Sequence, residues 1–337
     1  MKGCGLLWSS FFDDFLLVSK PELTKSAEQA AISFFKLTGW LFAEEGRKCV
    51  PFDVRCEALG VEFDLSGTSQ LHACIRNTES RVHELVQELE DAVKAESLSS
   101  KQAQRLRGRM QFADSQIFGR TSKRCLYTLA DFALGLRRAL SEKDIMFLKL
   151  FVKFLRQGPP RPLVPGDEAN ILIFTDACYE RDARTWISGI GGVLVDPLTK
   201  RRRFFSWELT AEIRAKLGEG SKKQIIFEAE TLSAVAAILV WHKYVADKRC
   251  IVFVDNEGTK FSMLKARSDN DTVDKIVECF ANFESETSLI TWIARVASKS
   301  NIADPPSRGE VDALKASSAE DDTRIAIQIV HDICTKL

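Results

Sequence analysis

The sequence predicts an α/β fold, in which a mixed sheet flanked by helices follows a more helical first half. Three observations predict it. The second half alternates short apolar runs, typical of strands, with segments whose apolar residues recur at helical spacing. Its predicted order between residues 170 and 309, βββαβαβ, is that of an α/β domain of roughly 140 residues. A run rich in proline and glycine, 158–166, cannot continue a helix and predicts an extended connector between the two halves.

The sequence of the first half predicts a hairpin followed by helices. Two short β-prone runs, 6–12 and 15–18, flank Asp13 and Asp14, which are expected at the tip of the hairpin. The remaining elements of this half are a helix over 22–40, a strand over 58–63, and helices over 102–113, 126–140 and 145–155.

The sequence of the second half predicts the mixed sheet and its helices. Strands are expected over 171–175, 188–195 and 203–207, and Asp196-Pro197 forms the turn between the last two. A helix over 227–241, a strand over 250–254, a helix over 273–283 and a strand over 289–293 complete the domain.

Composition excludes several classes of protein. The chain has 337 residues, of which 45% are hydrophobic and 28% charged, as in folded globular proteins. The longest nearly apolar run, 232–241, is about half of the roughly 20 residues that span a bilayer, so no membrane partner is expected. Nine cysteines without a CxxC pair predict reduced thiols in an intracellular protein, cytoplasmic or nuclear. Only four histidines are present, and none forms a close pair, so any metal must be held by carboxylates.

Acids stand at the ends of several predicted elements of the second half. Asp176 and Asp255 follow apolar strands, Glu228 and Glu230 begin a helix, and Asp304 follows the last strand. Acids just beyond strands lie at the edge of a sheet where α/β proteins bind ligands, and several converging there favour divalent cations. Each acid alone is also explained as a turn former or as a complement to the helix dipole. Two Mg²⁺ ions held by such acids can support phosphodiester hydrolysis.

The motifs of the second half resemble those of one family. FTDACYE, GIGGVLVD, FFSWEL, FVDNEG and RVASKSNIADPPSRG together resemble the ribonuclease H domain of retroelement polyproteins, particularly tyrosine-recombinase (DIRS-like) retrotransposons. The resemblance implies a metal site formed by Asp176, a helix-start glutamate, Asp255 and Asp304. The family places this glutamate three residues before a small residue, which favours Glu230, ahead of Ser233, over Glu228. The histidine that many members carry before the last acid is missing between Asp255 and Asp304, which puts the turnover rate in doubt.

The first half resembles part of a reverse transcriptase. WSSFFDDFLLV is similar to the hairpin that carries the aspartate pair, and GWLFAEEGRKCVPF and ALGVEFDL are similar to the next palm segments. This resemblance implies a remnant polymerase site at Asp13, Asp14 and Lys48. The earlier palm strand, the fingers and the template-gripping helix are not in the sequence, so we expect the C-terminal part of a truncated polymerase without templated synthesis. Whether another chain supplies the missing half stays open.

The segment between these regions is strongly basic. Residues 97–165 carry 14 Lys and Arg against 4 Asp and Glu, although the net charge of the whole chain is zero. A solvated helix surface and a phosphate-binding face both explain this imbalance. LRGRMQFADSQIFGR resembles the thumb or connecting region of DIRS-like elements, which implies nucleic-acid contacts at Arg105, Arg109 and Arg120.

These resemblances divide the chain and suggest its function. The expected regions are a partial palm (1–70), a helical thumb or connection (71–157), a linker (158–169), a ribonuclease H-like domain (170–309) and a C-terminal helical tail (310–337). The implied activity is hydrolysis of the RNA strand of RNA–DNA hybrids with two Mg²⁺ or Mn²⁺ ions. The alternative is a non-catalytic remnant that binds nucleic acid. An integrase or resolvase of the same superfold is disfavoured by the palm-like segments.

Overall fold

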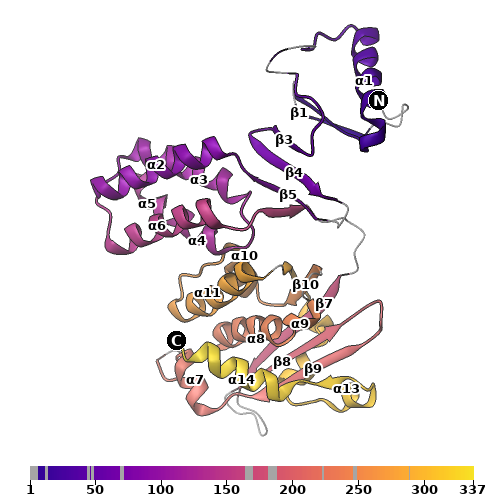
Figure 1. Ribbon diagram of the computed structural model, residues 1–337. Coiled ribbons are helices and arrows are strands. Elements are labelled where there is room, and N and C mark those ends of the chain that lie inside the picture. The colour runs from indigo at the N-terminus through magenta and orange to yellow at the C-terminus, as the bar shows by residue number, and fades with distance from the viewer. Residues whose placement is uncertain are drawn as a thin grey trace. The chain divides into compact units, whose positions relative to one another are not determined.

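The chain forms two compact units, which are described separately (Figure 1). The computed structural model describes residues 7–11, 14–43, 46, 49–68, 72–163, 170–180, 188–221, 224–245, 249–287 and 289–337. The first unit comprises Met1–Asp91, Phe112–Phe118 and Val152–Pro165, and the second comprises Ala92–Gln111, Gly119–Phe151 and Gly166–Leu337. Within the described ranges, no helix is long and apolar enough to cross a membrane.

The first unit begins with the predicted hairpin. Strands β1 (Leu7–Phe11) and β2 (Asp14–Val18) pair antiparallel. A short 3-10 turn, η2 (Pro21–Leu23), leads into α1 (Thr24–Thr38), which ends at Gly39 in the left-handed region (φ 71°). A left-handed residue at the end of a helix is most often glycine, because glycine has no Cβ to strain.

A four-stranded antiparallel sheet follows in the same unit. Its order is β3 (Arg55–Ala58), β4 (Val61–Gly67), β5 (His72–Asn77) and β6 (Arg161–Leu163). Strand β6 lies in the segment predicted as an extended connector, so part of that segment belongs to a sheet. The edge position explains how Pro162 fits into a strand, because an edge strand does not need every N–H group.

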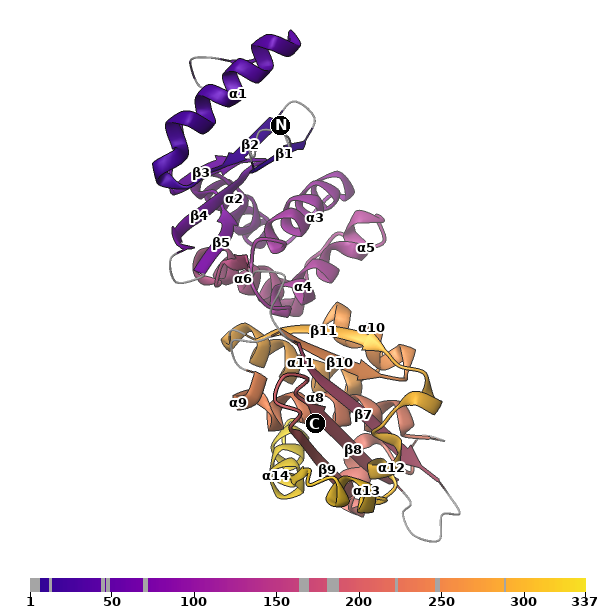
Figure 2. The same cartoon turned by 90° about the vertical axis from the view of Figure 1, so that its right-hand side faces the viewer.

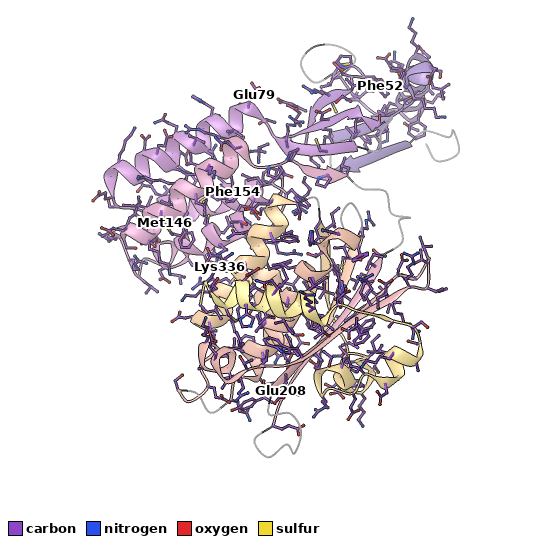
Figure 3. All side chains as sticks on the ribbon, turned by 60° about the horizontal axis from the view of Figure 1, so that its bottom comes forward. Phe52, Glu79, Met146, Phe154, Glu208 and Lys336 are labelled. Atoms are coloured by element: carbon purple, nitrogen blue, oxygen red, sulfur yellow. The ribbon has the colours of Figure 1, made fainter. Side chains whose placement is uncertain are left out.

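The helical region contributes to both units. Its elements are α2 (Glu79–Ala95), α3 (Ser100–Asp114), α4 (Thr121–Leu126), the 3-10 turn η4 (Tyr127–Leu129), α5 (Ala130–Ala133) and α6 (Glu142–Gln157). The helix predicted over 126–140 ends early, because Gly135 adopts φ 77° and the chain beyond it is extended. There, the Leu98 N–H donates to Arg138 O at 2.9 Å. On α6, Leu148 is fully buried and Met146 is 54% exposed (Figure 3).

The second unit contains the predicted mixed sheet. Its order is β11 (Ile290–Arg295), β10 (Arg249–Val254), β7 (Ile171–Tyr179), β8 (Ser188–Val195), β9 (Arg202–Glu208) and β12 (Glu320–Asp321). Strands β7, β8 and β9 form an antiparallel meander, whereas β10 pairs parallel with β7 and β11 parallel with β10. Figure 3 labels Glu208, the last residue of β9.

Helices cover the sheet on both faces. The remaining helical elements are α7 (Ala211–Leu217), α8 (Ile226–Val240), α9 (His242–Val245), α10 (Glu257–Lys265), α11 (Asp271–Glu286), η5 (Ser298–Ser300), α12 (Asp304–Ser307), α13 (Asp312–Ala316) and α14 (Thr323–Cys334). Helix α8 lies against β7 and β8 and is flanked by α11 and α14, and together they bury the main core (Figure 1). On the other face, the segment from α12 to α13 packs on β8 and β9 through Ala303, Val193 and Phe204 (Figure 2).

The segment predicted as a C-terminal tail is an integral part of the second unit. Helix α14 buries Ala326 and Val330 against the main core. Asp322, which precedes α14, accepts hydrogen bonds from Trp241 Nε1 (2.8 Å) and from Arg203 Nε (2.6 Å) and Nη2 (2.7 Å). The sequence shows the helix, but these contacts join residues about 80 and 120 positions apart, which local patterns do not reveal.

Candidate active site

Two of the predicted acids are on neighbouring strands. Asp176 lies within β7, which continues to Tyr179, and it pairs with Gly191 of β8 rather than following the strand as predicted. Asp255 directly follows β10. The parallel register joins Phe253 to Phe174, so its continuation by two residues brings Asp255 beside Asp176.

The two candidate glutamates both lie on α8 but have different partners. Ser233, one turn after Glu230, donates its hydroxyl to Gly191 O at 3.0 Å, so this face of the helix is turned to the sheet. Glu230 shares a side-chain hydrogen bond with Asp255. Glu228 instead accepts from Asn270 Nδ2 at 2.8 Å, and Asn270 caps α11. The structure therefore brings Glu230, and not Glu228, to the two strand aspartates.

The fourth acid is carried by α12. Asp304 is the first residue of this short helix. Asn301 fixes the loop before it, because its Nδ2 donates to Thr175 O of β7 at 3.0 Å and its Oδ1 accepts from Ala303 N at 3.2 Å. The charge of Asp304 raises the pKa of Asp176, which places the two side chains in one electrostatic environment.

The absence of a Cβ at Gly191 lets α12 approach the sheet. A Cβ built there would lie 2.3 Å from Ser307 N and 2.7 Å from Pro306 C, closer than side chains ever approach. The glycine-rich segment of β8 therefore has a steric role at this site, since any larger residue would push α12 and Asp304 away from β7.

Burial and like charges act together on the acids. Burial, followed by the charges of Asp255 and Asp304, raises the pKa of Asp176 to about 7, against the lowering effect of a hydrogen bond from Ser307. Burial is also the largest cause that raises the pKa of Glu230 to about 8, followed by the charges of Asp255 and Asp176. Such mutual repulsion is expected of carboxylates that converge without a counter-charge between them.

The donor set fits a hard divalent cation. All four groups offer carboxylate oxygens, which Mg²⁺ and Mn²⁺ prefer. Asp255 Oδ1 is buried without a hydrogen-bond partner, so it has a lone pair available for another ligand. In the described part of the chain, however, no three His, Cys, Asp or Glu side chains already have the arrangement of a metal site.

Arg308 lies at the border of the site. Its Nε donates to Asp304 Oδ1 at 3.3 Å, and its Nη1 pairs with Glu180. It is partly exposed, and within the described residues it forms ion pairs with Glu180 and Asp304 but not with the other three acids. It therefore offsets charge only at the Asp304 side of the cluster.

The predicted nucleic-acid contacts are placed differently from one another. Arg105 is exposed and Arg109 half-buried on α3. Arg120 does not belong to the exposed basic surface. Its guanidinium pairs with Glu284 and donates to Thr291 Oγ1 (2.7 Å) and Thr291 O (2.9 Å), so it joins the helical region to α11 and β11. An arginine satisfied in this way is not available to a phosphate.

The predicted remnant polymerase site is only partly described. Asp13 and Lys48 lie outside the described residues. The backbone of Asp14 pairs with Phe11 in the β1–β2 hairpin.

Residues that the sequence did not single out support the acids. Asn256 caps α10 by accepting from Thr259 N at 3.2 Å, and its side chain hydrogen-bonds Glu230. Ser307 Oγ donates to Asp176 Oδ2 at 2.9 Å. Asn256 lies in the motif FVDNEG and Ser307 in NIADPPSRG, so the sequence drew attention to both segments. No local pattern, however, indicated which acid each of the two side chains contacts.

The chain is similar to several solved structures. No protein-family model and no curated protein matches the chain. Among solved structures, the chain is similar to the N-terminal RNase H domain of a Mycobacterium tuberculosis protein (15% identity, 45% of this chain, 99% of that chain, TM-score 0.31). It is also similar to RNase H1 of Halobacterium salinarum (15% identity, 43% of this chain, 98% of that chain, TM-score 0.31). A foamy viral protease-reverse transcriptase in complex with double-stranded DNA matches 86% of this chain and 46% of that chain (10% identity, TM-score 0.41).

The second unit has a ribonuclease H-like fold. This assignment follows from its own topology, an antiparallel meander β7–β8–β9 extended by parallel β10 and β11, with α8 crossing the sheet and α12 on the opposite face. Because folds of this kind support several chemistries, the activity has to be argued from the site itself.

Proposed function

We infer that this chain is a divalent-cation-dependent endonuclease that hydrolyses the RNA strand of RNA–DNA hybrids. The observation that carries this proposal is the convergence of Asp176, Glu230, Asp255 and Asp304, with the pKa of the first two raised by burial and mutual charge. A purely structural cluster would gain by pairing its carboxylates with Lys or Arg, whereas a cation site keeps them available for the metal. Within the described residues, Arg308 pairs with Asp304, and no Lys or Arg pairs with Asp176, Glu230 or Asp255.

The four acids would hold the cations, and the surrounding residues would orient them. Two bound Mg²⁺ or Mn²⁺ ions supply an activated water and stabilise the leaving oxygen of a phosphodiester. Ser307 and Asn256 direct the carboxylates of Asp176 and Glu230 through hydrogen bonds. The choice of the RNA strand would depend on recognition of its 2′-hydroxyl groups.

We extend the proposal to the origin of the chain. The motif resemblance described above supports a retroelement polymerase of the DIRS-like group, with Asp13, Asp14 and Lys48 as remains of a polymerase site. The exposed Arg105 and the half-buried Arg109 of α3 would contact the phosphate backbone of the hybrid.

The test is a cleavage assay on the purified chain with three duplexes of one sequence. With Mg²⁺, we expect cleavage of the RNA strand of the RNA–DNA hybrid, and none of double-stranded DNA or RNA. The products should carry 3′-hydroxyl and 5′-phosphate ends. The alternative, a non-catalytic protein that binds nucleic acid, predicts binding of the hybrid with no cleavage under any cation.

A further inference from the structure

A buried hydroxyl connects two of the candidate metal-binding acids. Ser307, at the end of α12, is completely buried. Its Oγ lies 2.9 Å from Asp176 Oδ2 on β7 and 2.8 Å from the backbone oxygen of Asp304, the first residue of its own helix. A serine hydroxyl has one proton, and an ionised carboxylate is the stronger of the two acceptors, so the proton is directed to Asp176.

The backbone around Ser307 is fixed on three sides. Ser206 Oγ of β9 donates to Pro306 O at 2.5 Å, and Cys178 Sγ of β7 lies 3.0 Å from Ser307 O. Gly191 of β8 leaves the space into which Ser307 N fits. Because the backbone is held by these three strands, the hydroxyl of Ser307 has little freedom to move away from Asp176.

This hydrogen bond joins β7 and α12, two elements that are far apart in the sequence and that each carry one of the acids. Strand β7 carries Asp176 within the sheet, and α12 carries Asp304 onto its face. Asp176 Oδ2 is engaged by the hydroxyl, so the rotation of this carboxylate is restricted and Oδ1 keeps one orientation. Restricting a ligand through a neighbouring hydrogen bond is how residues around metal ions raise affinity.

We propose that Ser307 is a positioning residue of the candidate cation site, whose hydroxyl fixes the orientation of the Asp176 carboxylate. The proposal rests on the proposed function, since it concerns the same site. Simple packing would require only the volume of the side chain, which alanine nearly retains. Positioning requires the hydroxyl itself, and this difference can be measured.

The experiment compares Ser307→Ala with two control variants. Ser317→Ala removes a hydroxyl that makes the same bond three residues back, to Leu314 O at 2.8 Å, but Ser317 is exposed just after α13 and its hydroxyl bonds no acid within the described residues. Ser206→Ala weakens the attachment of α12 without removing a hydrogen bond from a carboxylate. Mn²⁺ binding is followed by the electron paramagnetic resonance signal of the free ion, and hybrid cleavage is followed in parallel as a function of Mg²⁺ concentration.

We expect Ser307→Ala to weaken Mn²⁺ binding by about 10–100-fold, the usual effect of losing a hydrogen bond to a metal ligand. Cleavage should fall at low Mg²⁺ and recover at high Mg²⁺, while KM for the hybrid stays unchanged because Ser307 does not touch the substrate. Ser317→Ala should match the wild type in every respect, and Ser206→Ala should have a smaller effect than Ser307→Ala. Thermal melting confirms that each variant is folded, and Ser307→Cys, which retains a weak donor of similar size, should bind Mn²⁺ with intermediate affinity.

Two results would overturn the inference in different ways. Wild-type Mn²⁺ affinity and cleavage in Ser307→Ala and Ser307→Cys would show that the hydroxyl has only a packing role, and the proposed function would stand. A wild-type chain that neither binds Mn²⁺ nor cleaves the hybrid would overturn the proposed function together with the role of Ser307.

Discussion

Asp176 shows at the residue scale why the candidate site is unstable without a cation. It is 6% exposed and lies near two further acids, which raise its pKa to about 7 in addition to the effect of burial. Between its unfolded pKa and this value, the folded state binds more protons than the unfolded state. The contribution of Asp176 to the free energy of unfolding is therefore fully present below about pH 4, and it is lost as the pH rises through about 7.

Asp176→Asn should consequently separate activity from stability. The change removes a candidate metal ligand, so cleavage should fall by at least about 10²–10³-fold, the effect of removing one preorganised electrostatic group. Without metal at pH 8, the variant should be more stable than the wild type by about 1–3 kcal/mol, less than the roughly 4 kcal/mol of an isolated three-unit pKa difference because the neighbouring acids are coupled. Urea unfolding in EDTA at pH 4 and pH 8 measures this, and the difference should disappear at pH 4. Equal stability at both pH values would contradict the electrostatic account.

The two glutamates of α8 form a natural pair of test and control. Glu230→Gln should reduce cleavage by at least about 10²-fold, because it removes a charge that faces the cluster. Glu228→Gln should leave cleavage within about threefold of the wild type, because glutamine can still accept from Asn270 and no cation is expected there. Single-turnover cleavage of the hybrid by both variants decides the assignment. Greater damage from Glu228→Gln would reverse it.

At the scale of elements, the sheet and its helices bring together residues distant in the chain. The apolar runs before Asp176 and Asp255 are visible in the sequence, so both acids could be predicted as candidates, although β7 continues past Asp176 to Tyr179. The family resemblance favoured Glu230 over Glu228, and the rotation of α8, which the contact of Ser233 with Gly191 reveals, brings Glu230 to the strand aspartates. The nine-residue α10 was not predicted, because so short a helix shows little periodicity.

Contacts between elements account for the remaining differences from the sequence predictions. Arg120 belongs to a basic segment by composition, but its neighbours Glu284 and Thr291 come from more than 160 residues further along the chain. Local patterns report which residues are charged, and only the tertiary structure shows which of them are already paired. The same argument applies to α14, whose helical pattern is visible in the sequence and whose attachment through Asp322 is not.

Asp322→Ala tests the attachment of α14. The substitution leaves the largely buried guanidinium of Arg203 without its bidentate partner, and we expect a loss of about 3–5 kcal/mol in the free energy of unfolding. Asp332→Ala is the matched control, since Asp332 is exposed on α14 and, within the described residues, its side chain accepts a hydrogen bond only from Gln328 Nε2. Its effect should stay within about 0.5 kcal/mol. Similar urea midpoints for both variants would show that α14 is a dispensable tail.

Two arginines of α3, the exposed Arg105 and the half-buried Arg109, provide an electrostatic test. Replacing Arg105 and Arg109 together by Gln should weaken binding of hybrids of any sequence and flatten the log–log salt dependence by up to about two units, since each neutralised phosphate contributes about 0.9 for B-DNA. Lys315→Gln with Lys336→Gln removes the same charge from the C-terminal segment and serves as the control (Figure 3). Fluorescence anisotropy over a series of salt concentrations measures both. An unchanged slope in the arginine variant would assign these residues to ordinary solvated surface.

At the scale of the whole molecule, the chain contains a first unit and a ribonuclease H-like second unit. The sheet and hairpin of the first unit resemble part of a polymerase palm only in their sequence motifs. The residues proposed for catalysis all belong to the second unit. Activity on hybrids should therefore be independent of Asp13 and Asp14, whatever the first unit contributes to binding.

The most direct test of the central claim is RNA cleavage in an end-labelled RNA–DNA hybrid by the purified full chain, with and without Mg²⁺. Asp255→Asn is measured beside the wild type, because Asp255 contributes the buried, unpartnered oxygen of the cluster. The account predicts Mg²⁺-dependent cuts in the RNA strand by the wild type, none after EDTA, and none by Asp255→Asn although it folds and binds the hybrid. Cleavage by Asp255→Asn at the wild-type rate, or a folded wild type that binds the hybrid and leaves it intact with both Mg²⁺ and Mn²⁺, would contradict it.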